Sequence, residues 1–332
     1  MLKNYNYMYL MILIMSTLFS ISSNSWINIW MGMEINLMSF IPLMMDNYNS
    51  LTNESMMKYF LIQAIASTFF FFFIILKMLK MKWFISEMSL IPTIIINLAL
   101  LMKMGAAPFY QWFPQVMKNL SWKNCFILST WQKIIPIMTL SYMMNYKILY
   151  ISIIMSALIG SIMGLNQNNL KFIMTFSSIN HLSWIITSIL INMNLWNMYF
   201  ICYSILTFSC MFIFYSFNLS HMNQFFSLKI NNMMKIMIIM NFLSLGGLPP
   251  MFGFFPKWLV INSLTTNNNL FIVILLVMTS LINLFFYLRL TISSLMILNY
   301  ELKWNFYLNT SNLTLKFITY LNIFWLIMMI FS

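Results

Sequence analysis

Long apolar segments separated by short polar linkers run along the whole chain, and this pattern limits the folds that the chain can adopt. The chain is 61% hydrophobic and 7% charged over 332 residues, and its mean hydropathy is +0.84. A soluble protein of this length could not cover so apolar an interior with polar surface. The sequence therefore predicts an all-α polytopic membrane protein, because helices satisfy their own backbone hydrogen bonds in lipid.

The apolar segments predict about eleven transmembrane helices. They lie at roughly residues 5–22, 26–45, 56–79, 87–118, 124–144, 148–166, 171–191, 195–219, 235–265, 269–298 and 313–331. The linkers are short and rich in turn-forming residues, as at 46–50, 166–169 and 267–269. No soluble domain fits between the segments, so we expect a single transmembrane domain that covers residues 1–332.

The fourth and ninth segments contain helix-breaking residues, namely Gly105, Pro108, Pro249, Pro250 and Pro256. Proline lacks the backbone N–H that an α-helix needs, and glycine loses more conformational entropy than other residues when a helix forms. A lysine lies close to each break in the sequence. A broken membrane helix beside an ionisable group is typical of an ion path.

The two broken segments are five segments apart, which is an odd number. Two five-helix units would therefore cross the membrane in opposite orientations, as the inverted repeats of many ion transporters do. We expect a first five-helix unit at residues 1–145, a second, inverted unit at 146–298 and a C-terminal helix at 299–332. Linker lysines are more numerous on the N-terminal side of the membrane, which predicts that the N-terminus lies inside.

Four charged residues fall inside the predicted spans rather than at their ends: Glu34, Lys103, Lys133 and Lys257. A charge at the bilayer centre costs roughly 2.5–3.5 kcal/mol on insertion scales. One interpretation is structural, in which ion pairs lock the helices or the lysines reach the headgroups. The other is a proton relay, because burial disfavours the charged form of a lysine and a nearby carboxylate favours it.

Two further residues are secondary candidates for such a relay. His181 lies inside the seventh segment, where a lone imidazole is either a hydrogen-bonded core residue or a relay member. Lys171 opens the same segment, where it either anchors the helix end or feeds the relay.

The remaining polar residues argue against other classes of protein. The formal net charge is +12, but the lysines are scattered among linkers, so we expect no binding of nucleic acid. The three cysteines (Cys125, Cys202 and Cys210) and the two histidines lack the spacing of iron–sulfur or haem ligands. We therefore expect no metal and no cofactor in this chain.

Several short motifs follow one another along nearly the whole chain. They comprise residues 30–36, 39–42, 58–61, 103–109, 130–134, 164–167, 177–179, 243–250 and 256–258, with Glu54, Trp112, His181 and Gly253. In this order the chain resembles the antiporter-like membrane subunits of respiratory complex I. The resemblance implies inverted five-helix repeats with two broken helices, and a relay in which Glu34 and Lys103 are the switching pair. Lys133 would be the central carrier and Lys257 the exit-side carrier.

The same resemblance implies a subunit of an enzyme that carries none of the redox chemistry itself. It would translocate protons across the inner mitochondrial membrane, coupled to electron transfer from NADH to ubiquinone in other subunits. FMN, iron–sulfur clusters and ubiquinone are then expected in partner subunits. The expected partners are other membrane-arm subunits, including further antiporter-like subunits, and a lipid such as cardiolipin. The N-terminus would face the matrix and the C-terminus the intermembrane space.

One position departs from the family pattern. The family usually has His after Ala-Pro-Phe, whereas this chain has Tyr110, followed by Gln111. A phenol can order water but titrates near pH ~10 rather than near neutrality, so Tyr110 is a weaker candidate for the relay. Two other functions stay open: a stand-alone cation/proton antiporter built from the same repeat, and a structural spacer of the membrane arm whose charges only lock helices.

Overall fold

The structure is a computed structural model of the chain, and it describes residues 2–45, 49–79, 90–222, 224, 232–249 and 251–296. The described residues form α-helices and contain no β-strand, apart from one isolated bridge between Asn169 and His221. The predicted span 313–331, the expected C-terminal helix 299–332 and Pro250 lie outside the described residues. The predicted all-α architecture is confirmed for the described part of the chain.

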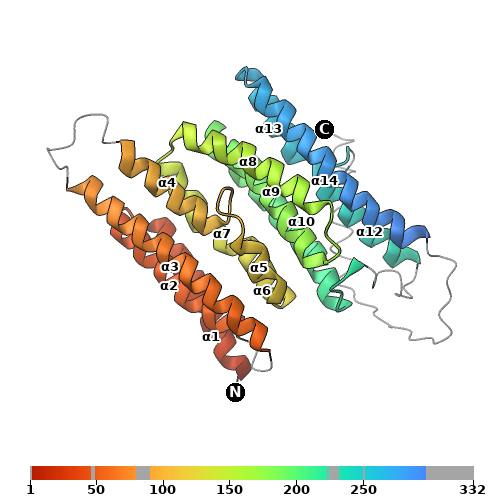
Figure 1. The fold of residues 1–332 in the computed structure, drawn as a ribbon, viewed down its shortest axis with the longest axis horizontal. Coiled ribbons are helices and arrows are strands. Elements are labelled where there is room, and N and C mark those ends of the chain that lie inside the picture. The colour runs from red at the N-terminus through yellow and green to blue at the C-terminus, as the bar shows by residue number, and fades with distance from the viewer. Residues whose placement is uncertain are drawn as a thin grey trace. The chain divides into compact units, whose positions relative to one another are not determined.

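The chain divides into two compact units, Met1–Ser156 and Ala157–Ser332, and the boundary falls inside helix α8 (Tyr146–Gly164). The first unit contains α1 (Leu2–Ser22), α2 (Trp26–Met44), α3 (Ser50–Met78), α4 (Leu90–Met104), α5 (Trp112–Asn119), α6 (Trp122–Ser129) and α7 (Trp131–Tyr142). The second contains α9 (Leu170–Ile191), α10 (Met193–Ser216), α12 (Asn232–Gly246), α13 (Phe254–Thr266) and α14 (Leu270–Met296). Figure 1 labels these helices. The expected unit boundaries at 145 and 298 and the inverted orientation of the repeats stay predictions.

Seven of the described helices are long and apolar enough to cross a membrane, judged by length and composition. They are α1, α2, α3, α8, α9, α10 and α14. The other described helices are shorter, because breaks divide the predicted fourth, fifth and ninth spans. The total of eleven spans therefore stays a prediction.

Within the first unit, α1 and α2 lie side by side in close contact (Figure 1). A Cβ atom built on Gly32 of α2 would lie 2.7 Å from the Cβ of Ser20 of α1. Small residues let membrane helices approach closely, which is what holds them together where lipid is as apolar as the protein. Helix α3 packs against α2 and α4, and α4 also packs against α7. These contacts bring together the helices that carry Glu34, Lys103 and Lys133.

Helix α9 is the central helix of the second unit. It contacts α10, α13 and α14, and every side chain from Ile173 to Ile189 is buried. At one end of this unit the backbone N–H of Met222 donates to the carbonyl of Asn168, over 3.0 Å. The Nη2 of Arg289 donates to the carbonyl of Gln167, over 3.1 Å. The part-buried Arg289 therefore binds a backbone carbonyl of the linker between α8 and α9.

Two details differ from the predictions. The fifth span, predicted as one helix over 124–144, is divided into α6 and α7 at Thr130, whose φ is −118° and ψ −70°. The hydroxyl of Thr130 donates to the carbonyl of Phe126 over 2.8 Å, and such a bond to the preceding turn bends helices. Pro256, predicted to break a helix, instead lies in the first turn of α13, where a proline is tolerated because the first N–H groups have no partner within the helix.

Candidate functional site

The first helix break lies between α4 and α5. Helix α4 ends at Met104 because Gly105 has a φ of +70°, in the left-handed region that glycine adopts without strain, and Pro108 follows. Side chains from neighbouring helices donate to two carbonyl groups at the break, and that of Met102 also accepts from the N–H of Gly105 over 3.2 Å. The Nε2 of Gln63 donates to the carbonyl of Lys103 over 3.1 Å, and the Nε1 of Trp112 donates to the carbonyl of Met102 over 3.1 Å.

Lys103 lies in the last turn of α4 and is 7% exposed. The C-terminal end of a helix carries a partial negative charge, which stabilises a cation there. The Nζ of Lys103 lies 3.5 Å from the Sδ of Met33 on α2. Glu34 is the next residue of α2, and it does not form an ion pair with Lys103 within 4.0 Å. One carboxylate oxygen of Glu34 is buried and has no hydrogen-bond partner among the described residues.

Lys133 lies in the first turn of α7 and is 2% exposed. Its Nζ is 4.9 Å from the centre of the Phe113 ring, within the range of a cation–π contact. A cavity separates it from the end of α4. The lining residues are Tyr59, Gln63, Lys103, Met104, Trp112, Phe113, Leu128, Gln132 and Lys133. The volume that the centre of a water molecule can reach is about 10 Å³, which is room for about one water molecule.

A chain of three uncharged polar residues crosses the same region. The Nε2 of Gln132 on α7 donates to the Oδ1 of Asn36 on α2 over 3.0 Å. The hydroxyl of Tyr59 on α3 donates to the Oε1 of Gln132 over 3.4 Å. The pattern of charges inside the spans does not identify these residues or Gln63, because all of them are uncharged. Amide side chains inside apolar segments are a signal that could have found them.

The second helix break lies between α12 and α13. Helix α12 ends at Gly246, and the next residue, Gly247, has a φ of +78°. Lys257, in the first turn of α13, is 6% exposed, and its Nζ donates to the carbonyl of Gly246 over 2.9 Å. The same Nζ lies 6.0 Å from the centre of the Trp184 ring on α9. Pro249 lies in the connection between the two helices, as predicted.

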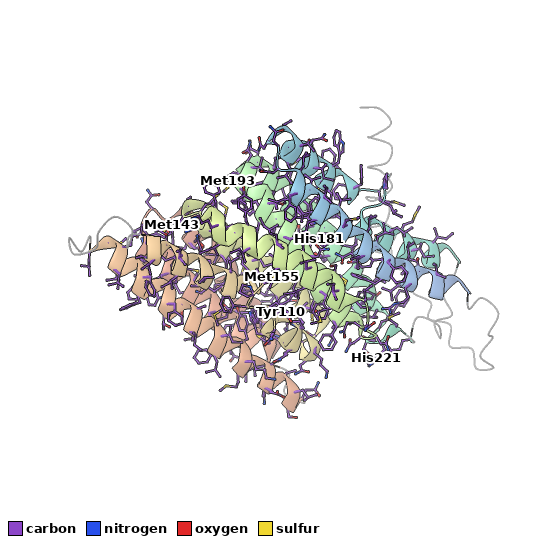
Figure 2. All side chains as sticks on the ribbon, turned by 45° about the horizontal axis from the view of Figure 1, so that its top comes forward. Tyr110, Met143, Met155, His181, Met193 and His221 are labelled. Atoms are coloured by element: carbon purple, nitrogen blue, oxygen red, sulfur yellow. The ribbon has the colours of Figure 1, made fainter. Side chains whose placement is uncertain are left out.

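His181, labelled in Figure 2, lies on α9 beside the rings of Tyr199 and Tyr203 and is 7% exposed. Its Nδ1 is 2.9 Å from the hydroxyl of Tyr199 on α10, and the tautomer of the ring decides which of the two donates. The ring centre lies 5.1 Å from that of Tyr203. Trp184 stacks on Tyr199 with an interplanar angle of 7°. One aromatic cluster therefore contacts both His181 and Lys257.

The other predicted candidates lie apart from these clusters. Tyr110 lies in the connection between α4 and α5 (Figure 2), and it does not line the cavity. Lys171 lies in the first turn of α9 and is half-buried, and its N–H donates to the Oδ1 of Asn169 over 3.2 Å. No group of three or more His, Cys, Asp or Glu residues that could hold a metal ion exists within the described ranges.

The structure thus groups the predicted relay residues by unit. It brings Glu34, Lys103 and Lys133 together in the first unit. It connects Lys257 and His181 through the aromatic cluster of the second unit. Passage of a proton from the first group to the second stays a prediction.

Comparisons with known proteins agree on the type of protein. Residues 23–283 match the family described as "NADH:quinone oxidoreductase/Mrp antiporter", transmembrane region. The chain is 50% identical to the NADH-ubiquinone oxidoreductase chain 2 of Anopheles gambiae, over 96% of this chain and 95% of that protein. It is 42% identical to the chain 2 of Locusta migratoria, over 90% of this chain and 87% of that protein.

A solved structure shares the fold at low sequence identity. A chain of respiratory complex I from Thermus thermophilus superposes with a TM-score of 0.84 and 17% identity, over 97% of this chain and 77% of that chain. The broken helices and the buried lysines therefore occur in an antiporter-like fold. From the family match and the chain-length identity to these relatives, we conclude that the chain belongs to the NADH-ubiquinone oxidoreductase chain 2 family of antiporter-like membrane subunits.

Proposed function

We propose that the chain translocates protons across the inner mitochondrial membrane as a membrane subunit of respiratory complex I, through Glu34, Lys103, Lys133 and Lys257. Its relatives are named as subunits of NADH-ubiquinone oxidoreductase, which supports the assignment to that enzyme. The observation that carries the relay is that Lys103 and Lys133 line one cavity with room for about one water molecule. A water molecule in this cavity would pass the proton from one lysine to the other.

Each residue of the first unit has a distinct role in this proposal. Glu34 and Lys103 form the switching pair, since a carboxylate favours a charged lysine when the two approach. Separation of the pair makes Lys103 a proton donor toward the cavity. Lys133, on the other side of the cavity, accepts the proton as the central carrier. Phe113 provides a ring face against the charge that Lys133 then holds.

The second unit supplies the exit-side carrier. Lys257 holds its Nζ on the carbonyl of Gly246, at the end of α12 where the helix dipole favours a cation. His181 is a second proton-carrying group of this unit through its bond to Tyr199. Lys171 and Tyr110 are secondary members, since neither lines the cavity.

The partner subunits, the lipid and the membrane orientation that we propose rest on the relatives and on the distribution of lysines. We assign NADH, FMN, the iron–sulfur clusters and ubiquinone to partner subunits, together with further antiporter-like subunits beside this chain. Bound lipid such as cardiolipin fits the basic linkers. The excess of linker lysines on the N-terminal side supports an N-terminus in the matrix and a C-terminus in the intermembrane space, by the positive-inside rule.

The two alternatives receive less support. A spacer needs ion pairs that lock its helices, and the pair of Glu54 and Lys58 lies at a helix end, with both side chains exposed. A stand-alone antiporter needs stability without partners. Purification of the intact chain outside the complex in a folded, proton-exchanging form would favour that function over ours.

The relay is tested with Lys103→Met and Glu34→Ala in the assembled complex. We expect normal assembly and NADH binding, with proton transfer through this chain lowered roughly a hundredfold, at the lower end of the effect of a positioned proton-transfer group, so that fewer protons are translocated for each NADH oxidised. Lys58→Met is the matched control, because it removes a lysine of the same unit whose side chain is 40% exposed. The measurement is proton uptake by vesicles that contain the complex. Normal translocation in both variants would rule out the relay.

A further inference from the structure

The Nζ of Lys257 occupies a space that exists because residue 247 has no side chain. A Cβ atom built on Gly247 would lie 2.7 Å from this Nζ, 3.0 Å from the Cδ and 3.1 Å from the Cε of Lys257. Real Cβ atoms do not approach other atoms to 2.7 Å, so the lysine would have to move. Gly247 thus serves two purposes, since its φ of +78° also ends the helix.

The surroundings of this Nζ suit an ammonium group. The carbonyl of Gly246 accepts from it over 2.9 Å, and this carbonyl ends α12, where the partial negative charge of the helix is concentrated. The face of Trp184 lies 6.0 Å away and attracts a cation through its ring quadrupole. These contacts come from α12 and α9, while the lysine itself belongs to α13.

Trp184 contributes to the surroundings of Lys257 through its aromatic ring rather than through its N–H group. The residue is 1% exposed, and its Nε1 has no hydrogen-bond partner among the described residues. A buried indole usually finds an acceptor for this N–H. The ring is held by stacking on Tyr199, with ring centres 6.3 Å apart. The contribution of Trp184 is therefore its aromatic face.

We propose that Gly247 and Trp184 are positioning residues for Lys257, which hold its ammonium on the last carbonyl of α12 between two proton transfers. This inference rests on the proposed function, because it gives Lys257 a resting position within the relay. Gly247 and Trp184 do not titrate in the physiological range. They would affect proton transfer only by positioning Lys257. The helix break and the position of the carrier are then set by the same glycine.

The first test is a double-mutant cycle on the stability of the assembled complex. Gly247→Ala should lower the thermal midpoint, and the shift should be smaller when Lys257→Ala has removed the clashing side chain, because contacting residues are not additive. Strain from φ alone would be the same in both backgrounds. Equal shifts in the two backgrounds would overturn the role of Gly247. This result does not depend on whether Lys257 carries protons.

The second test concerns Trp184 and uses the ratio of protons translocated to NADH oxidised. Trp184→Leu should lower proton translocation about two- to fivefold at equal NADH oxidation, the effect of one cation–π contact, and Trp184→Phe should restore most of it. Trp196→Leu is the matched control, since Trp196 is also buried in the second unit and its Nε1 has no hydrogen-bond partner within the described part of the chain. Equal losses in Trp184→Leu and Trp196→Leu would overturn the role of Trp184. Normal translocation in Lys257→Met would instead contradict the relay itself.

Discussion

At the scale of single residues, uncharged side chains stabilise the first helix break. Gln63 and Trp112 bind the carbonyls of Lys103 and Met102 at the end of α4, where regular helical hydrogen bonding stops. An unpaired buried carbonyl is costly in lipid, where no water replaces the lost bond. The lysine at this break therefore depends on neighbours that never carry a charge.

We expect Gln63→Leu to destabilise the first unit by about 1–3 kcal/mol, because the carbonyl of Lys103 loses its partner in a buried position. Thermal inactivation of the assembled complex measures the loss. Gln111→Leu is the control, since Gln111 is exposed in the same connection. A Gln63→Leu complex as stable as the control would contradict the role of this hydrogen bond.

The residues of the site differ in how far the sequence could predict them. Lys103, Lys133 and Lys257 were found because a charge inside an apolar segment is conspicuous, and the structure buries all three. Gln63 was missed because its importance depends on the packing of α3 against α4. The partners of His181 were also missed, since Tyr199 lies on the following helix and its contact depends on how the two helices rotate against each other.

At the scale of helices, the second break is the more tightly packed. A Cβ atom built on Gly253 would lie 1.8 Å from the carbonyl oxygen of Ser244. This clash involves backbone atoms, so no side-chain rotation can relieve it. The start of α13 therefore touches the last turn of α12. The sequence predicted the breaks at the fourth and ninth spans from Gly105, Pro108 and Pro249, but not the joint at Thr130, which depends on a local hydroxyl bond.

We expect Gly253→Ala to prevent assembly of the subunit, because neither backbone can yield without separating α12 from α13. Gly246→Ala should be tolerated, since the nearest atom to its Cβ would be the Cγ of Leu284 at 3.5 Å, an ordinary contact. The amount of subunit in the purified complex measures both. Normal assembly of Gly253→Ala would show that the two helices pack less closely than described.

At the scale of the whole molecule, the orientation in the membrane can be tested in the second unit. The linker between α8 and α9 and the linker between α13 and α14 lie on opposite sides of the membrane in the predicted topology. Asn168 and Asn267 are exposed in these linkers, and the native cysteines Cys125, Cys202 and Cys210 are buried. A cysteine introduced at either position would therefore be labelled much more readily than the native cysteines of this chain.

We expect Asn168→Cys to react with an impermeant thiol reagent when the matrix face is open to it, and Asn267→Cys when the outer face is open. The reason is the excess of linker lysines on the N-terminal side. Labelling of mitochondria stripped of the outer membrane, and of inverted vesicles, gives the two measurements. The reverse pattern would place the N-terminus in the intermembrane space.

The close contacts of the glycines limit how this chain can change over time. It has only seven glycines, and a Cβ atom at six of them, all but Gly246, would lie within 3.1 Å of another atom. The many methionines, isoleucines and phenylalanines on exposed helix faces can be substituted for one another by neutral mutation, since each of these side chains is compatible with lipid. The six glycines cannot be exchanged in that way. Selection on this protein should therefore act on these six positions without a side chain as well as on the charged residues of the relay.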